Sequence, residues 1–150
     1  MQLLKVLFDT STLVASMVED HPSHSNCLPW LQRVQNEEIS GYVCTHTIAE
    51  LYAVLTRFPR TPRISPELAQ QLLLENLIKF NTVSLIAEDY QAVIARMVGL
   101  NIPGGGIYDG LIAQAAIKAE VNLLLTLNPN NFTRLGEDIA RLVHIPTDSF

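Results

Sequence analysis

Short apolar runs alternate with longer segments of helical periodicity along this chain. Most of the short runs are apolar on both faces, which is typical of strands buried inside a parallel sheet. They comprise residues 3–8, 41–45, 82–86, 121–126 and 142–145. Between them, apolar residues recur three and four positions apart. This spacing predicts helices over residues 11–19, 24–38, 47–58, 65–79, 87–99 and 109–120, with Pro29 near a start or a kink of the second helix.

Strands that alternate with helices predict βαβ units, and therefore an α/β fold with a parallel sheet of about five strands flanked by helices. No repeat, charge block or Ser/Gly linker divides the sequence, so we expect residues 1–150 to form a single domain. In such sheets, ligands bind beyond the carboxyl ends of the strands. The residues that directly follow each strand are therefore the candidates for function.

Composition and charge narrow the classes of protein. Of the 150 residues, 48% are apolar and 17% are charged, which argues against disorder. The net charge of −5 excludes a histone-like nucleic-acid binder, whose affinity comes from many contacts between basic side chains and phosphates. The same charge is compatible with a site at which metal ions supply the positive charge.

The N-terminal segment and the cysteines favour a cytoplasmic location. Lys5 and Asp9 interrupt the N-terminal segment, so it lacks the core of a signal peptide. No stretch approaches the roughly 18 apolar residues of a membrane span. Cys27 and Cys44 match no zinc-ligand spacing. We interpret them as small core residues in a reducing compartment.

Three acidic residues, Asp9, Glu50 and Asp109, each stand alone among apolar or small neighbours. Asp9 directly follows the first strand, which places its carboxylate at the edge of the sheet. The hydroxyl residues Thr10-Ser11-Thr12 come next and are able to orient a carboxylate. Alternatively, Asp9 or Ser11 is simply the cap of the following helix. Taken alone, the cap is the simpler interpretation.

Glu50 also has a structural explanation. The segment Thr47-x-x-Glu50 matches a capping box, in which Glu50 reaches back to the start of its own helix. Glu50 lies off the apolar stripe of that helix, which we expect to pack against the sheet and which consists of Ile48, Leu51, Tyr52 and Leu55. Spacing does not separate a capping carboxylate from one that lies at the strand ends.

Asp109 gives the clearest functional signal, because it stands at the head of a buried helical stripe. The stripe consists of Ile112, Ala113, Ala116 and Ile117. An ionised carboxylate in that position needs a helix N-terminus, a hydroxyl or a cation as its partner. The preceding Pro103-Gly104-Gly105-Gly106 matches neither a Walker A loop nor a dinucleotide fingerprint, and we interpret it as a flexible loop.

Considered together, the three acidic residues predict a metal site. A parallel sheet would bring them close to one another, and two carboxylates about 4 Å apart repel by roughly 4 kcal/mol at an effective dielectric near 20. Protons or a hard divalent cation would offset that repulsion, and oxygen ligands select Mg²⁺ or Mn²⁺. Such a cation would activate a water for attack, which suits phosphodiester hydrolysis.

Four segments, taken in order, resemble the PIN-domain nucleases and, within them, the VapC-like toxins of toxin–antitoxin pairs. They are residues 7–11 (LFDTS), 47–51 (TIAEL), 106–113 (GIYDGLIA) and 124–132 (LLTLNPNNF), and together they extend over nearly the whole chain. The resemblance implies a metal-dependent endoribonuclease with Asp9, Glu50 and Asp109 as acidic ligands. It also implies an RNA substrate, a cognate antitoxin that blocks the site, and homodimers.

The fourth segment departs from the pattern of the family. Many relatives have an acidic residue where this chain has Asn128, and Asn131 replaces another commonly acidic residue. Asn128 offers a neutral carbonyl ligand without charge, so we expect one catalytic ion, or weak occupancy of a second site. Thr126 is a candidate to orient the site through its hydroxyl. Thr126 and Asn128 also fit a plain turn before Pro129.

Two other classes of protein compete with a nuclease. Asn128 is compatible with a non-catalytic RNA-binding or scaffold protein of the same fold. A phosphoryl-transfer domain is disfavoured, because Ser11 stands where a related phosphatase needs a second Asp, and Pro146 where a receiver domain needs a Lys. The cluster Arg57, Arg60 and Arg63 could contact an RNA backbone or an acidic partner, although a solvated loop is the simpler interpretation.

Overall fold

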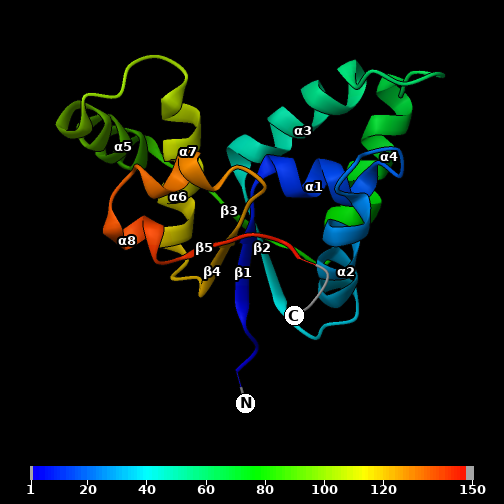
Figure 1. Cartoon of the computed structure of the whole chain (residues 1–150), viewed down its shortest axis with the longest axis horizontal. Coiled ribbons are helices and arrows are strands. Elements are labelled where there is room, and N and C mark those ends of the chain that lie inside the picture. Colours follow the sequence, from blue (N-terminus) through cyan, green and yellow to red (C-terminus); the bar gives the residue numbers. More distant parts are fainter. Residues whose placement is uncertain (1, 148–150) are drawn as a thin grey trace.

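A five-stranded parallel sheet forms the centre of the fold (Figure 1). The computed structural model describes residues 2–147. The strands are β1 (Lys5–Phe8), β2 (Ser40–Cys44), β3 (Asn81–Val83), β4 (Leu123–Leu125) and β5 (Val143–His144), in the order β3-β2-β1-β4-β5. All four neighbouring pairs are parallel, which confirms the predicted α/β class. Each strand lies at or within one residue of its predicted run, but most are shorter than the run.

The six predicted helices are all present. They are α1 (Thr10–Met17), α2 (His24–Gln35), α3 (Thr45–Arg57), α4 (Pro66–Leu77), α5 (Ala87–Leu100) and α6 (Gly106–Lys118). Pro29 lies inside α2. Two short helices were not predicted, α7 (Pro129–Thr133) and α8 (Glu137–Ala140), because segments of five and four residues are too short for a helical period to stand out.

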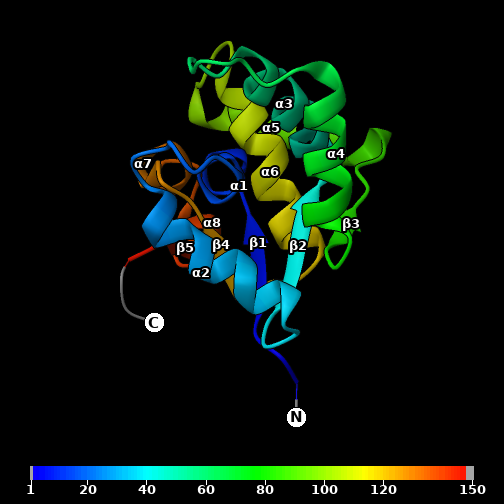
Figure 2. The same cartoon turned by 90° about the vertical axis from the view of Figure 1, so that its right-hand side faces the viewer.

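The sheet separates two apolar cores, and successive residues of β1 point into different ones. Val6 and Phe8 belong to a core shared with α1 and α2, whereas Leu7 belongs to a core shared with α5 and α6. Figures 1 and 2 show the corresponding helices on opposite faces of the sheet. Burial of both faces explains why the strands read as continuous apolar runs. Free Cys27 and Cys44 are buried in this interior, as expected of core residues.

The central strand sets the position of the carboxyl edge of the sheet. β1 pairs with β2 on one side and with β4 on the other, so Asp9 emerges between the ends of these two strands. Helices α1 and α3 begin directly after β1 and β2, with almost no intervening loop. Asp9, Thr45 and Thr126 are therefore brought to one edge by the order of the strands.

Helix α3 departs from the predicted packing. Leu51 and Leu55 are buried, but Tyr52 is 44% exposed. Because α3 contacts α1, α4 and α6 and does not lie flat on the sheet, it buries a narrower stripe than expected. Within residues 2–147, no helix combines the length and the apolar character that a membrane crossing requires.

Gly41 in β2 permits a close approach between the sheet and α2. A Cβ atom at this position would lie 2.8 Å from both Cγ atoms of Val34 and 2.9 Å from a ring carbon of Phe80. All three residues are buried. A larger residue would therefore force apart a packed layer.

We expect Gly41→Ala to lower the free energy of unfolding by about 1–3 kcal/mol, the usual range for overpacking a core. Gly99→Ala is the matched control, because Gly99 lies in α5 and a Cβ there meets no atom within 4 Å. That control should stabilise the protein slightly, since alanine favours a helix over glycine. Urea unfolding of both variants provides the measurement, and equal stability of Gly41→Ala and the wild type would contradict the packing role.

Candidate active site

Asp9 is buried at the end of β1, with 4% of its surface exposed. Its Oδ1 accepts hydrogen bonds from the Ser11 hydroxyl (2.7 Å) and the Thr12 backbone N–H (3.0 Å), and its Oδ2 accepts one from the Thr126 hydroxyl (2.6 Å). Asp9 is thus the cap of α1, as its simpler interpretation predicted. The Thr126 contact adds a second function, because it fixes the carboxylate from the end of the neighbouring strand β4. Burial raises the pKa of Asp9, although these hydrogen bonds oppose the shift.

Thr126 joins the end of β4 to the acidic site. Its hydroxyl donates to Asp9 and accepts from the Asn128 backbone N–H at 2.9 Å. Both alternatives for this segment are therefore realised: it forms a turn before Pro129, and the same turn holds the hydroxyl that orients Asp9. The adjacent Leu127 N–H donates to Ser11 Oγ at 3.2 Å, which ties the turn to α1.

The capping box predicted for Glu50 is wrong. Helix α3 begins at Thr45, so Thr47 lies inside the first turn and does not cap it. The cause is the direct passage from β2 into α3, which leaves no room for a separate cap. The Glu50 carboxylate instead accepts a 2.7 Å hydrogen bond from the Thr10 hydroxyl of α1, and lies 3.4 Å from His46 Nε2.

Asp109 lies in the first turn of α6, close to the head of the helix as predicted. Its pKa is raised to about 6, first by burial and then by the negative charges of Asp9 and Glu50, whereas the charge of Arg134 opposes the shift. The electrostatic coupling places the three carboxylates in one region. Ile112, Ala113 and Ala116 are buried as expected of the stripe, but Ile117 is 36% exposed.

One pocket of about 350 Å³ receives all three carboxylates together with Asn128. Thr10 and Ser11 contribute its hydroxyls. The remaining wall is formed by His21 and by four apolar side chains, Val14, Val54, Phe58 and Ile112. The pocket therefore combines a cluster of oxygen atoms with an apolar surface that excludes water and strengthens electrostatic interactions.

The three carboxylates line the same pocket but do not form a compact set of ligands. Among residues 2–147, no three His, Cys, Asp or Glu side chains converge closely enough to hold a metal. Asp9 and Glu50 hydrogen bond to hydroxyls instead, which stabilises their carboxylates without a cation. The donor chemistry nevertheless suits a hard cation, since every polar group from the three acidic residues and Asn128 offers oxygen.

Several features of this site were missed in the sequence. The i, i+4 spacing of His46 and Glu50 was an available signal. No sequence signal pointed to His21 or Arg134. His21 lies in the segment that connects α1 to α2, and Arg134 lies at the end of α7. The glycine-rich loop also differs from expectation: Gly106 starts α6, and a Cβ there would lie 2.6 Å from Ile102 Cγ2, so the residue serves close packing.

The arginine cluster does not contribute to this pocket. Arg60 pairs with Asp20 at 3.6 Å, and the Arg57 guanidinium donates to the carbonyl of Ala53 in the preceding turn. Arg63 lies near the Arg57 carbonyl. These local contacts agree with the simpler interpretation of the cluster as part of a solvated segment.

Relatives of known name match most of this chain. Ribonuclease VapC27 of Mycobacterium tuberculosis (strain H37Rv) is 32% identical over 116 residues, which cover 77% of this chain and 79% of the relative. Ribonuclease VapC40 of the same species is 31% identical, with coverage of 77% and 81%.

Solved structures share the fold at lower sequence identity. VapBC2 of Rickettsia felis, bound to a DNA fragment from its promoter, gives a TM-score of 0.65 at 19% identity, covering 95% of this chain and 98% of that one. VapC20 of M. tuberculosis, a toxin that cleaves the sarcin–ricin loop, gives 0.62 at 12% identity, with coverage of 79% and 86%. Residues 6–138 match the PIN domain itself. The resemblance seen in the sequence is thereby confirmed, and the chain belongs to the PIN domain family.

Proposed function

We propose that this protein is a metal-dependent endoribonuclease and the toxin of a VapBC-type toxin–antitoxin pair. The observation that carries the proposal is that Asp9, Glu50 and Asp109, which come from three distant segments, line one pocket. The ribonucleases VapC27 and VapC40 support the class of reaction. That reaction is the hydrolysis of an RNA phosphodiester bond by water.

Crowding of the carboxylates favours a divalent cation as the cofactor. The pKa of Asp109 is raised first by burial and then by the negative charges of Asp9 and Glu50, so a nearby cation would favour its ionised form. We assign Asp9, Glu50, Asp109 and the amide oxygen of Asn128 as ligands, because such oxygen atoms suit Mg²⁺ or Mn²⁺. When bound, the cation lowers the pKa of an attacking water and stabilises the leaving oxygen.

Neighbouring residues hold these carboxylates in place. Thr126 and Ser11 each donate a hydrogen bond to Asp9, from opposite sides of its carboxylate. Thr10 restrains Glu50 in the same manner. Arg134 supplies positive charge beside Asp109, which favours the ionised form of that carboxylate. The site is thus ordered by the chain itself, and ligation requires the side chains to draw together.

We further propose that a cognate antitoxin covers this pocket and that the toxin forms homodimers. VapBC2, whose fold this chain shares, supports the assignment of an antitoxin partner. The alternative is a non-catalytic RNA-binding or scaffold protein, which the neutral Asn128 favours. Calorimetry with Mn²⁺ separates the two, because a scaffold need not bind the ion in the micromolar to millimolar range.

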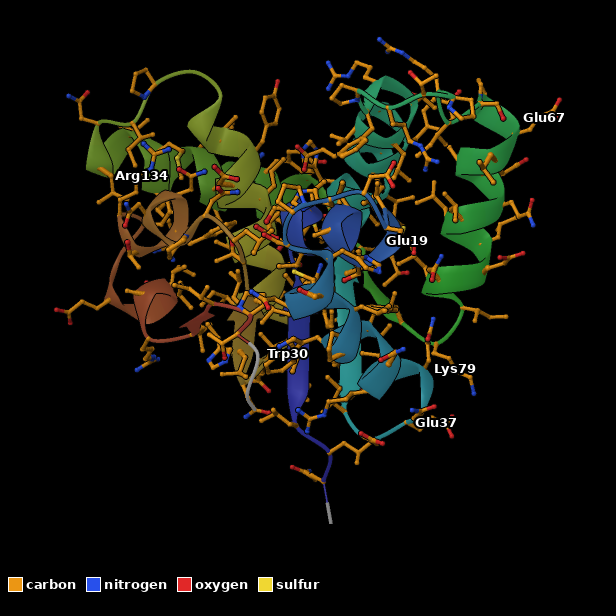
Figure 3. The ribbon with its side chains drawn as sticks, turned by 45° about the vertical axis from the view of Figure 1, so that its right-hand side comes forward. Glu19, Trp30, Glu37, Glu67, Lys79 and Arg134 are labelled. Carbon is orange, nitrogen blue, oxygen red and sulfur yellow. The ribbon has the colours of Figure 1, made fainter. Side chains whose placement is uncertain are left out.

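Asp9→Asn and Asp109→Asn should each abolish RNA cleavage. Each change keeps the shape of the side chain but removes a charge that holds the cation, so we expect Mn²⁺-dependent cleavage of a labelled RNA to fall more than about 100-fold, beyond the usual effect of outer-shell partners. Glu67→Gln is the control, since it removes the same charge from an exposed position on α4. Figure 3 shows Glu67 far from Arg134, whose charge acts on Asp109. Full activity of a folded Asp9→Asn or Asp109→Asn protein would refute the mechanism.

Asp109→Asn should also stabilise the metal-free protein at neutral pH. The pKa of Asp109 is raised to about 6 in the folded protein from an ordinary value of 3.8, so its ionisation destabilises the fold progressively above about pH 4 and fully above about pH 7. In EDTA, the unfolding free energy of Asp109→Asn minus that of the wild type should be about 1–3 kcal/mol larger at pH 7.5 than at pH 3.5. Urea titrations at both pH values measure this difference, and a gain independent of pH would contradict it.

Thr126→Val should impair turnover by releasing Asp9. The change keeps the size of a buried side chain but removes the hydroxyl that donates to Asp9 Oδ2. We expect kcat to fall about 10- to 100-fold with little change in KM, and Thr126→Ser to recover most of the loss. Equal impairment of the valine and serine variants would indicate a packing role instead.

A further inference from the structure

An exposed aromatic ring stands directly beside the acidic pocket. Tyr108 precedes Asp109 in the first turn of α6, and 52% of its surface is exposed. Its ring stacks on the imidazole of His46 in α3, with centroids 5.2 Å apart and planes within 5° of parallel. The stack therefore joins the helical turns that carry Asp109 and Glu50.

His46 holds the tyrosine ring in a fixed orientation. The imidazole is partly buried, and its Nε2 is enclosed 3.4 Å from Glu50 Oε1 without making a hydrogen bond to any described residue. One face of the Tyr108 ring lies on this imidazole, so the exposed part of the ring includes the opposite face. The Tyr108 hydroxyl forms no hydrogen bond within residues 2–147, which leaves stacking as the contact that orders the ring.

We propose that Tyr108, supported by His46, is a stacking platform for one unpaired RNA base next to the phosphodiester bond that is cut. The inference rests on the proposed function, since it names how that site holds its substrate. Tyr108 precedes Asp109 in α6, and its stacking partner His46 lies 3.4 Å from Glu50, so a base on the ring would lie near the carboxylates. Every base has a flat π face, and exposed aromatic side chains hold single-stranded RNA by stacking on such faces.

The charge of the protein favours such a platform. The net charge is −5, and three carboxylates line the pocket, so the electrostatic field of the apo site repels an RNA backbone. The bound cation offsets this repulsion only locally. Affinity must therefore come partly from contacts that do not depend on charge, and stacking on a rigid ring supplies one without ordering a flexible side chain.

Kinetics of Tyr108 variants on a short single-stranded RNA with Mn²⁺ test the platform. Stacking contributes to substrate and transition state alike, so Tyr108→Ala should raise KM about 10-fold or more while kcat changes less than about 2-fold. Tyr108→Phe should retain the wild-type KM, because it keeps the ring. Tyr90→Ala is the matched control: Tyr90 is 41% exposed on α5, and it has neither the stacking contact with His46 nor the position next to Asp109 that Tyr108 has.

Abasic substitutions in the RNA identify the base. Removing the base at one position should raise KM of the wild type by the same factor as Tyr108→Ala, and should raise KM of Tyr108→Ala no further. A wild-type protein that cleaves no RNA would overturn both the proposed function and the platform. Normal cleavage with an unchanged KM in Tyr108→Ala would overturn the platform alone, and weakened binding of the antitoxin by that variant would then assign the ring to the partner protein.

Discussion

A carboxylate buried at the end of the central strand governs the arrangement of this molecule. Asp9 is almost inaccessible to water, and an ionised group in that position is tolerated only if the protein replaces its hydration. The replacement comes from Ser11, Thr12 and Thr126, which belong to α1 and to the turn after β4. The same hydrogen bonds that stabilise Asp9 therefore lock together the ends of the two central strands and the start of α1.

The other two carboxylates of the site are arranged around Asp9. Glu50 is restrained by Thr10 of α1, so its position depends on the helix that Asp9 caps. Asp109 approaches from α6 without a hydroxyl partner among residues 2–147, and its pKa is raised first by burial and then by the charges of Asp9 and Glu50. Loss of hydration and repulsion therefore both oppose its ionised form. A cation in the pocket would offset both effects.

The apolar wall of the pocket has an electrostatic role as well as a steric one. Val14, Val54, Phe58 and Ile112 lower the local dielectric, which strengthens both the repulsion among carboxylates and their attraction for a cation. The stacked pair of Tyr108 and His46, whose imidazole lies 3.4 Å from Glu50, adds a surface whose attraction for a flat ligand does not depend on charge. In the proposed function, the carboxylates would hold the cation and this surface would hold a base of the RNA.

The sequence by itself determined the architecture and the three acidic residues, because both depend on patterns that are local in the chain. Apolar runs of strand length predicted all five strands, and isolation among apolar neighbours singled out Asp9, Glu50 and Asp109. The capping box of Glu50 failed since it assumed a loop between β2 and α3 that the fold lacks. Only the tertiary structure decided that Thr10 restrains Glu50, that Arg134 and His21 join the site, and that Tyr108 stacks on His46. These contacts join residues from separate helices and turns, so their geometry is set by how the elements pack and leaves no trace in the spacing of residues.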